Sequence, residues 1–131
     1  IKKYLEGLAE KAKKDGYVTT IANRRRLLPE IHSSNYQTRS FAERAAMNMP
    51  LQGSAADIMK IAMIRVRNAM QKEGLKSRIV LQIHDELIVD AFAEEAERIK
   101  EILVEEMENV FDTKVRLTVN VEEGTNLYEA K

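Results

Sequence analysis

Cysteine is absent from the 131 residues, and this absence excludes disulfide bonds and metal sites built on thiolates. No apolar run is long enough to span a membrane and no secretory signal pattern stands at the N-terminus, so a soluble, cytoplasmic protein without membrane contact is expected. The only two histidines, His32 and His84, are too far apart in sequence to form a helical pair of zinc ligands. Neither a Gly-x-Ser-x-Gly elbow nor a glycine-rich phosphate loop occurs, so nothing supports a serine hydrolase or a P-loop.

Net charge is zero at neutral pH, which by itself argues against a general nucleic-acid binder. The charges are nevertheless separated, because residues 1–80 hold 16 Lys and Arg against 7 Asp and Glu, whereas residues 81–131 hold 5 against 14. Two interpretations fit: basic and acidic surfaces that happen to fall in different halves, or a region that binds a phosphate backbone followed by one that attracts metal ions. The charge pattern alone favours the first.

The spacing of apolar residues predicts an α+β fold, with helices packed on a small, mostly antiparallel sheet. The expected helices cover about 1–15, 40–48, 55–73 and 96–110, and the expected strands are 17–21, a short run near 27–28, a hairpin over 79–91 and a strand over 115–122. Ser40 opens a capping box and should start a helix, which Pro50 should interrupt. The chain opens on Ile1 inside a helical pattern, without a cap or a methionine, which indicates a piece of a longer protein.

The tip of the predicted hairpin is unusual, because His84, Asp85 and Glu86 stand where tight turns usually carry Gly or Asn. Two adjacent carboxylates repel each other, and a cation would relieve that repulsion. Their oxygens suit Mg²⁺, which typically takes one or two carboxylates together with water and substrate phosphates. From the pattern alone, an ordinary polar turn is the commoner explanation.

A polar series follows helical spacing at Arg44, Asn48 and Gln52, although the predicted break at Pro50 separates Gln52 from the other two. Solvated helix positions are the commoner explanation. The functional alternative is a row of hydrogen-bond donors that face the DNA minor groove, where A·T and T·A pairs present the same acceptors. Four arginines would suit phosphates, namely Arg24, Arg25, Arg26 and Arg39, although a triple arginine is often a solvated hairpin tip.

Four motifs in order carry a resemblance to a known family. The run Gln82–Leu87 is similar to the third catalytic motif of the family A DNA polymerases. Three further stretches resemble the same family, namely Gly16–Thr20 with Arg24–Pro29, Arg44–Asp57, and the ending Asn126–Lys131. The chain departs from the family pattern at Ala22-Asn23, where many relatives have Phe-Gly, and at Leu127, where an aromatic residue is more usual.

The resemblance covers essentially the whole chain, and it implies a single polymerase piece over 1–131, with about 1–39 from the end of the fingers and about 40–131 from the palm. In the motif, Asp85 matches the catalytic, metal-binding aspartate, Glu86 a lesser acidic neighbour, and His84 a residue near the primer terminus. Positions that contact the primer–template match Arg44, Asn48 and Gln52. The family's other metal-binding aspartate, in a run like Asp-Tyr-Ser-Gln-Ile-Glu, has no counterpart here, and neither does the helix that grips the incoming nucleotide.

The function implied by the resemblance is that of a DNA-directed DNA polymerase fragment, in which two Mg²⁺ ions, or Mn²⁺ in their place, assist primer extension during DNA replication and repair. The expected partners are primer–template DNA and a dNTP, the expected parent is monomeric, and the isolated chain is expected to be inactive. The alternative is a non-enzymatic palm remnant that binds DNA or a protein partner.

Overall fold

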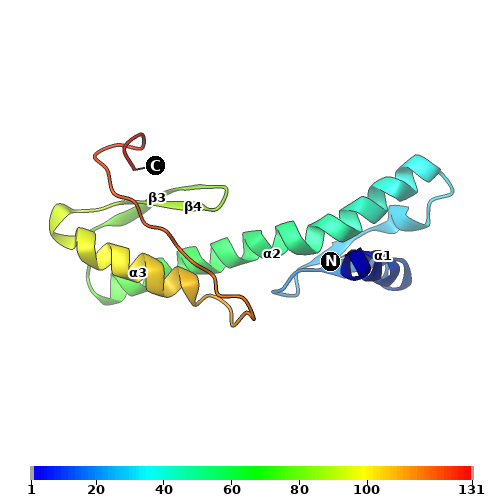
Figure 1. The fold of residues 1–131 in the computed structure, drawn as a ribbon, viewed down its shortest axis with the longest axis horizontal. Coiled ribbons are helices and arrows are strands. Elements are labelled where there is room, and N and C mark those ends of the chain that lie inside the picture. Colours follow the sequence, from blue (N-terminus) through cyan, green and yellow to red (C-terminus); the bar gives the residue numbers. More distant parts are fainter. Residues whose placement is uncertain (1, 131) are drawn as a thin grey trace. The chain divides into compact units, whose positions relative to one another are not determined.

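A computed structural model describes residues 2–130. The chain divides into two compact units, Ile1–Asp57 and Ile58–Lys131, and the long helix α2 (Tyr36–Lys72) contributes to both. The helices and strands of each unit can be followed in Figure 1. The fold is α+β, as predicted, with three α-helices and two small antiparallel hairpins among the described residues.

The first unit begins with α1 (Lys2–Asp15), which ends at Gly16 as the sequence predicts. Gly16 has a φ of 76°, a left-handed conformation that glycine adopts without a steric cost. The strands β1 (Tyr17–Thr19) and β2 (Arg25–Leu27) then pair antiparallel, and the 3₁₀-helix η1 (Pro29–His32) leads into α2. A buried cluster joins these elements and comprises Ala12, Val18, Leu28, Ile31, Ala42 and Ala46.

Asn23, at the departure from the family pattern, has a φ of 61° in the turn between β1 and β2. Asparagine tolerates the left-handed region better than most residues, so it meets a backbone demand that glycine would otherwise meet. The turn is closed by two backbone hydrogen bonds, from Thr20 N to Arg24 O at 3.0 Å and from Asn23 N to Thr20 O at 2.9 Å.

Two expectations about α2 are wrong. The helix begins at Tyr36 rather than Ser40, because Asn35 Oδ1 accepts hydrogen bonds from the backbone N–H groups of Gln37 at 2.9 Å and Thr38 at 3.3 Å. The helix also continues through Pro50, which is buried. Proline removes one backbone donor, but the packing of this segment outweighs that local cost.

The second unit places α3 (Ala96–Glu108) and the last part of α2 around a shared core with the β3–β4 hairpin. The buried members of this core are Val66, Met70, Ile99, Ile102 and Leu103. Strand β3 (Arg78–Ile83) pairs antiparallel with β4 (Glu86–Asp90), with an irregularity between Ile79 and Leu81, and the 3₁₀-helix η2 (Ala93–Glu95) precedes α3. The predicted hairpin and the predicted helix are thus both confirmed.

The carboxylate of Glu95 closes the base of this hairpin. It accepts hydrogen bonds from the backbone N–H of Lys76 at 3.0 Å, from the backbone N–H of Ser77 at 2.9 Å, and from the buried Ser77 hydroxyl. The Lys76 backbone donor, followed by the Ser77 hydroxyl, holds the pKa of Glu95 below its ordinary value of 4.5. Glu95 therefore fixes the start of β3 as long as it is ionised.

The predicted strand over 115–122 is wrong in its backbone, and the alternation of its side chains appears only from Leu117 onward, because Val115 is exposed. Residues 115–122 form no strand, because neither β3 nor β4 pairs with them and a strand requires a backbone partner. Leu117, Val119 and Val121 are nevertheless half-buried, whereas the residues between them are exposed. Glu108 Oε1 accepts a hydrogen bond from Val119 N at 3.0 Å and so takes the place of a ladder partner.

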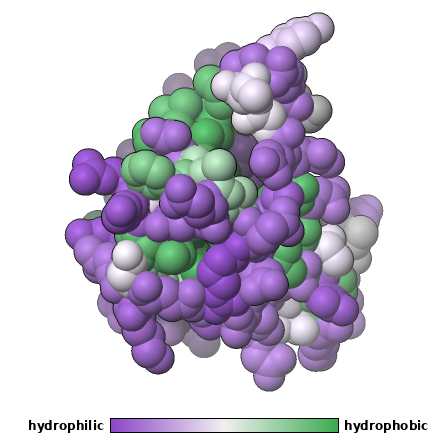
Figure 2. All heavy atoms as spheres, turned by 90° about the vertical axis from the view of Figure 1, so that its left-hand side faces the viewer, coloured by the Kyte–Doolittle hydropathy of each residue, from purple (hydrophilic) through white to green (hydrophobic). Residues whose placement is uncertain are grey.

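Large apolar side chains are exposed in the second unit, among them Val80, Leu81 and Phe92. In Figure 2, apolar atoms (green) reach the surface between polar ones (purple). No helix within residues 2–130 is long and apolar enough to cross a membrane.

Candidate metal and nucleic-acid sites

The β3–β4 hairpin turns through His84 and Asp85 alone, since Ile83 pairs directly with Glu86. His84 has a φ of 51°, in the left-handed region where histidine occurs more often than most residues. The side-chain amide of Gln82 donates to the carbonyl oxygen of His84 at 2.6 Å and so braces the turn from β3. A short turn with a constrained first residue fixes the direction in which the Asp85 backbone leaves it.

The carboxylates of Asp85 and Glu86 are both exposed at this tip. No group of three or more His, Cys, Asp or Glu residues capable of holding a metal occurs within 2–130. The donor set still fits one side of a Mg²⁺ site, because Mg²⁺ needs only one or two carboxylates when water and phosphate oxygens complete its octahedron. Ligands from outside this tip are therefore required.

The polar series on α2 lies on one face of a continuous helix. Arg44, Asn48 and Gln52 are spaced by four residues, so each is turned by about 40° from the one before, and all three are exposed. The helix through Pro50 thus settles the alignment of Gln52 that the predicted break had left open. Arg44 Nη1 donates to Ser40 Oγ at 2.9 Å, which orients its guanidinium along the helix.

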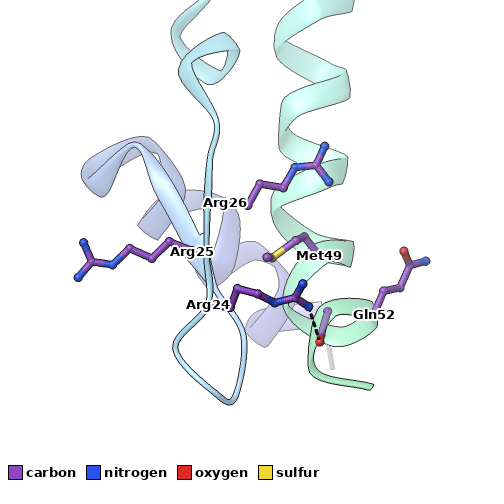
Figure 3. Close-up of a pocket in the computed structure, with 6 residues that line it drawn as sticks. Arg24, Arg25, Arg26, Met49 and Gln52 are labelled. Carbon is purple, nitrogen blue, oxygen red and sulfur yellow. Dashed lines mark hydrogen bonds between the residues drawn. The ribbon is translucent and has the colours of Figure 1, made fainter. Parts of the chain in front are cut away.

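The three consecutive arginines have three different environments in the first unit. Arg24 reaches α2, where its Nη2 lies 2.9 Å from Asp57 Oδ1 and 3.2 Å from the carbonyl oxygen of Gly53. The guanidinium of Arg25 lies over the ring of Tyr17, 4.8 Å from its centroid. Figure 3 shows Arg24 and Arg26 directed towards α2 and Arg25 directed away from it.

An open pocket of about 410 Å³ lies beside the contact between the arginine hairpin and α2, with Met49, Gln52 and Gly53 lining the helix side. Its other wall consists of Arg24, Arg25 and Arg26. The predicted phosphate ligands and Gln52, one of the predicted minor-groove donors, thus line the same pocket, and the amide of Gln52 is directed away from the arginines (Figure 3).

Close contact between the hairpin and α2 depends on Gly53. A Cβ atom at this position would lie 2.6 Å from Thr20 Cγ2, which is closer than two carbon atoms can approach. Ser54, the next residue, accepts a hydrogen bond from Ile21 N at 2.9 Å and donates to the carbonyl oxygen of Pro50. These contacts dock the hairpin turn directly on the helix backbone.

Asp57, Gly53 and Ser54 carry no functional signal of their own in the sequence, although all three contact the hairpin. Asp57 is buried, with 6% of its surface exposed, and its Oδ2 has no hydrogen-bond partner in the described part of the chain. A signal of burial was present, since Asp57 lies on the same side of α2 as the buried residues Ala46 and Pro50. A charged residue on the buried side of a helix indicates a buried ion pair.

Residues 1–129 match the sequence pattern of DNA polymerase family A, and the chain therefore belongs to the family A DNA polymerases. Among curated relatives, it is 50% identical over its full length to DNA polymerase I of Caldicellulosiruptor bescii and 49% identical to DNA polymerase I of Bacillus caldotenax. It spans 15% of the length of each of these relatives.

A solved structure of a relative, described as the POL domain of Pol1 from M. smegmatis in complex with DNA primer-template and dNTP, matches with a TM-score of 0.96 at 46% identity. The match covers 98% of this chain and 23% of that one. The family resemblance inferred from the motifs is thereby confirmed. The division into fingers and palm and the roles of individual site residues stay predictions.

Proposed function

We propose that this chain is part of a DNA-directed DNA polymerase, to which it contributes a carboxylate that holds a catalytic metal ion. The observation that carries the proposal is the exposed Asp85 at the tip of the β3–β4 hairpin, within the catalytic-motif run Gln82–Leu87. The family match and the primer–template and dNTP in the solved relative's description support it.

When bound, a pair of Mg²⁺ or Mn²⁺ ions supplies activation of the primer 3′-hydroxyl and stabilises the charge that develops on the α-phosphate and the leaving group. Asp85 is the ligand that this chain provides, and Glu86 is a secondary acidic neighbour. His84 sets the turn and lies next to the primer terminus. The second metal-binding aspartate comes from outside the chain, so residues 1–131 alone do not extend a primer.

The helix face of Arg44, Asn48 and Gln52 contacts the primer–template through donors directed at the minor groove, where correctly formed base pairs present acceptors at the same places. The hairpin that carries the arginine triplet brings positive charge to the phosphate backbone, through those of its arginines that are not paired with a carboxylate. In this assignment, residues before about 40 belong to the fingers and the later ones to the palm, and the complete polymerase acts as a monomer on primer–template DNA and dNTP.

The proposal is tested with Asp85→Ala in the complete polymerase that carries this chain. Loss of a metal ligand removes several kcal/mol of transition-state stabilisation, so kcat should fall on the order of 10³-fold or more, while DNA affinity stays within a few-fold. Glu86→Ala should be much milder. Asp90→Ala is the matched control, because Asp90 is an exposed aspartate at the opposite end of the same hairpin.

Single-turnover incorporation with saturating DNA separates the chemical step from binding. Equal and small losses for Asp85→Ala and Asp90→Ala would refute the metal-binding role of the tip. A complete parent that never extends a primer, although it binds DNA or a protein partner, would instead favour the non-enzymatic palm remnant. The isolated chain should incorporate no labelled dNTP, and incorporation abolished by Asp85→Ala would contradict its predicted inactivity.

A further inference from the structure

Arg24 differs from its two neighbours because both its backbone and its side chain are fixed by the protein. Its N–H donates to Thr20 Oγ1 at 3.1 Å, and its carbonyl oxygen accepts from Thr20 N at 3.0 Å. Its guanidinium bridges Asp57 and the Gly53 carbonyl oxygen. The backbone of Arg24 is thus fixed within the β1–β2 turn, and its side chain links that turn to α2.

The buried carboxylate of Asp57 favours the ion pair with Arg24 over an Arg24 side chain free in solvent. Its side chain is 8% exposed, and a buried carboxylate without a cation is costly, so removing Arg24 would leave that charge uncompensated. The Arg24–Asp57 ion pair is neutral as a whole, so it attracts a phosphate much less than a free guanidinium does. Arg24 is therefore poorly suited to be a phosphate ligand, although it stands in the arginine triplet.

Arg26, in contrast to Arg24, has no carboxylate partner among the described ion pairs. Residues 25 and 26 alternate across β2, so Arg25 lies over Tyr17 whereas Arg26 extends on the α2 side with Gln52 across the pocket (Figure 3). The position of Arg26 relative to α2 depends on how the hairpin is docked, and the contacts of Arg24 dock it.

We propose that Arg24 and Asp57 form a clamp that positions Arg26 against the DNA backbone, and that Arg24 itself contacts no phosphate. This inference rests on the proposed function, and it assigns the role of a positioning residue to Arg24 and a nucleic-acid-related role to Asp57. Asp57 supports DNA binding although its charge has the same sign as that of DNA.

The direction in which Asp57→Asn changes DNA affinity distinguishes the clamp from a direct contact between Arg24 and a phosphate. If Arg24 bound a phosphate and Asp57 merely neutralised it, Asp57→Asn would release Arg24 and strengthen DNA binding. If the pair is a clamp, Asp57→Asn weakens DNA binding despite the loss of a negative charge. Arg24→Lys gives a second contrast, since lysine keeps the charge for a phosphate, but its Nζ ends one bond short of the Nη2 atom that contacts both Asp57 and Gly53.

The experiment measures the Kd of the complete polymerase for primer–template DNA as a function of KCl. The unmodified enzyme is measured first, and a failure to bind or extend DNA at that step would count against the proposed function rather than against the clamp. Asp57→Asn, Arg24→Lys and Arg24→Met are each expected to weaken binding roughly three- to tenfold at about 0.1 M salt, the loss expected for one phosphate contact.

Arg26→Met is the reference, and it should reduce the slope of log K against log[KCl] by about 0.9. Adding Arg24→Met to Arg26→Met should reduce that slope no further, because both changes remove the same contact. Additive slopes, or tighter binding by Asp57→Asn, would overturn the clamp. A lower thermal stability of Asp57→Asn with an unchanged Kd would also overturn it, because the pair would then be purely structural.

Discussion

Gly53→Ala should destabilise the first unit, although alanine is the better helix former. At an unconstrained position inside a helix, the change gains roughly 0.5–1 kcal/mol. At Gly53 the new Cβ would lie 2.6 Å from Thr20 Cγ2, and Thr20 is 5% exposed, so it has little room to move. Overpacking of this kind costs typically 1–3 kcal/mol, which exceeds the gain in helix propensity.

Gly7→Ala in α1 is the matched control, because nothing lies within 4 Å of the Cβ that it would add. The two variants share the propensity gain, so the difference between their unfolding free energies isolates the clash and should be about 1–3 kcal/mol. Urea unfolding followed by circular dichroism measures this difference. Adding Thr20→Ser, which removes the clashing methyl group, should recover much of the loss. Equal stability of the Gly53→Ala and Gly7→Ala variants would refute the close approach.

Three further predictions concern the cap of α2, the base of the hairpin and the minor-groove face. Asn35→Ala should cost about 1 kcal/mol of unfolding free energy, whereas Ser40→Ala should cost much less. A larger loss for Ser40→Ala would show that Ser40, and not Asn35, caps the helix. The pKa of Glu95 is lowered in the folded state, so its ionised form stabilises the fold above its unfolded pKa and this contribution is lost as pH falls through the folded pKa. Glu95→Gln should therefore make the unfolding free energy less dependent on pH below about pH 5. An unchanged pH dependence would show that the contacts of Glu95 contribute nothing to stability. In the complete polymerase, Arg44→Ala and Gln52→Ala should slow extension from a matched primer terminus more than from a mismatched one. The difference should be roughly ten- to a hundredfold if one donor contact of about 1–3 kcal/mol is lost. An unchanged ratio of matched to mismatched extension rates, with a normal circular dichroism spectrum, would show that both residues are solvated helix positions without a role in DNA binding.

The candidate sites could be predicted from sequence only where the signal was local. The run around Asp85 was identified as a hairpin tip because two apolar strands flank three polar residues, and the structure confirms this turn. The spacing of Arg44 and Asn48 likewise placed them on one helix face. The environment of Arg24 was not predictable in this way, because its partner Asp57 lies more than thirty residues away and no local pattern records their pairing.

The sequence by itself determined the amphipathic helices α1 and α3, the β3–β4 hairpin and the order of the motifs, because hydrophobic periodicity and turn residues act over a few neighbouring positions. Only the tertiary structure decided that α2 passes through Pro50, that the arginines of one triplet take different environments, and that 115–122 stays unpaired. These outcomes depend on which distant segment supplies a packing surface, a countercharge or a backbone partner. A local rule such as the helix-breaking effect of proline holds until such a partner outweighs it.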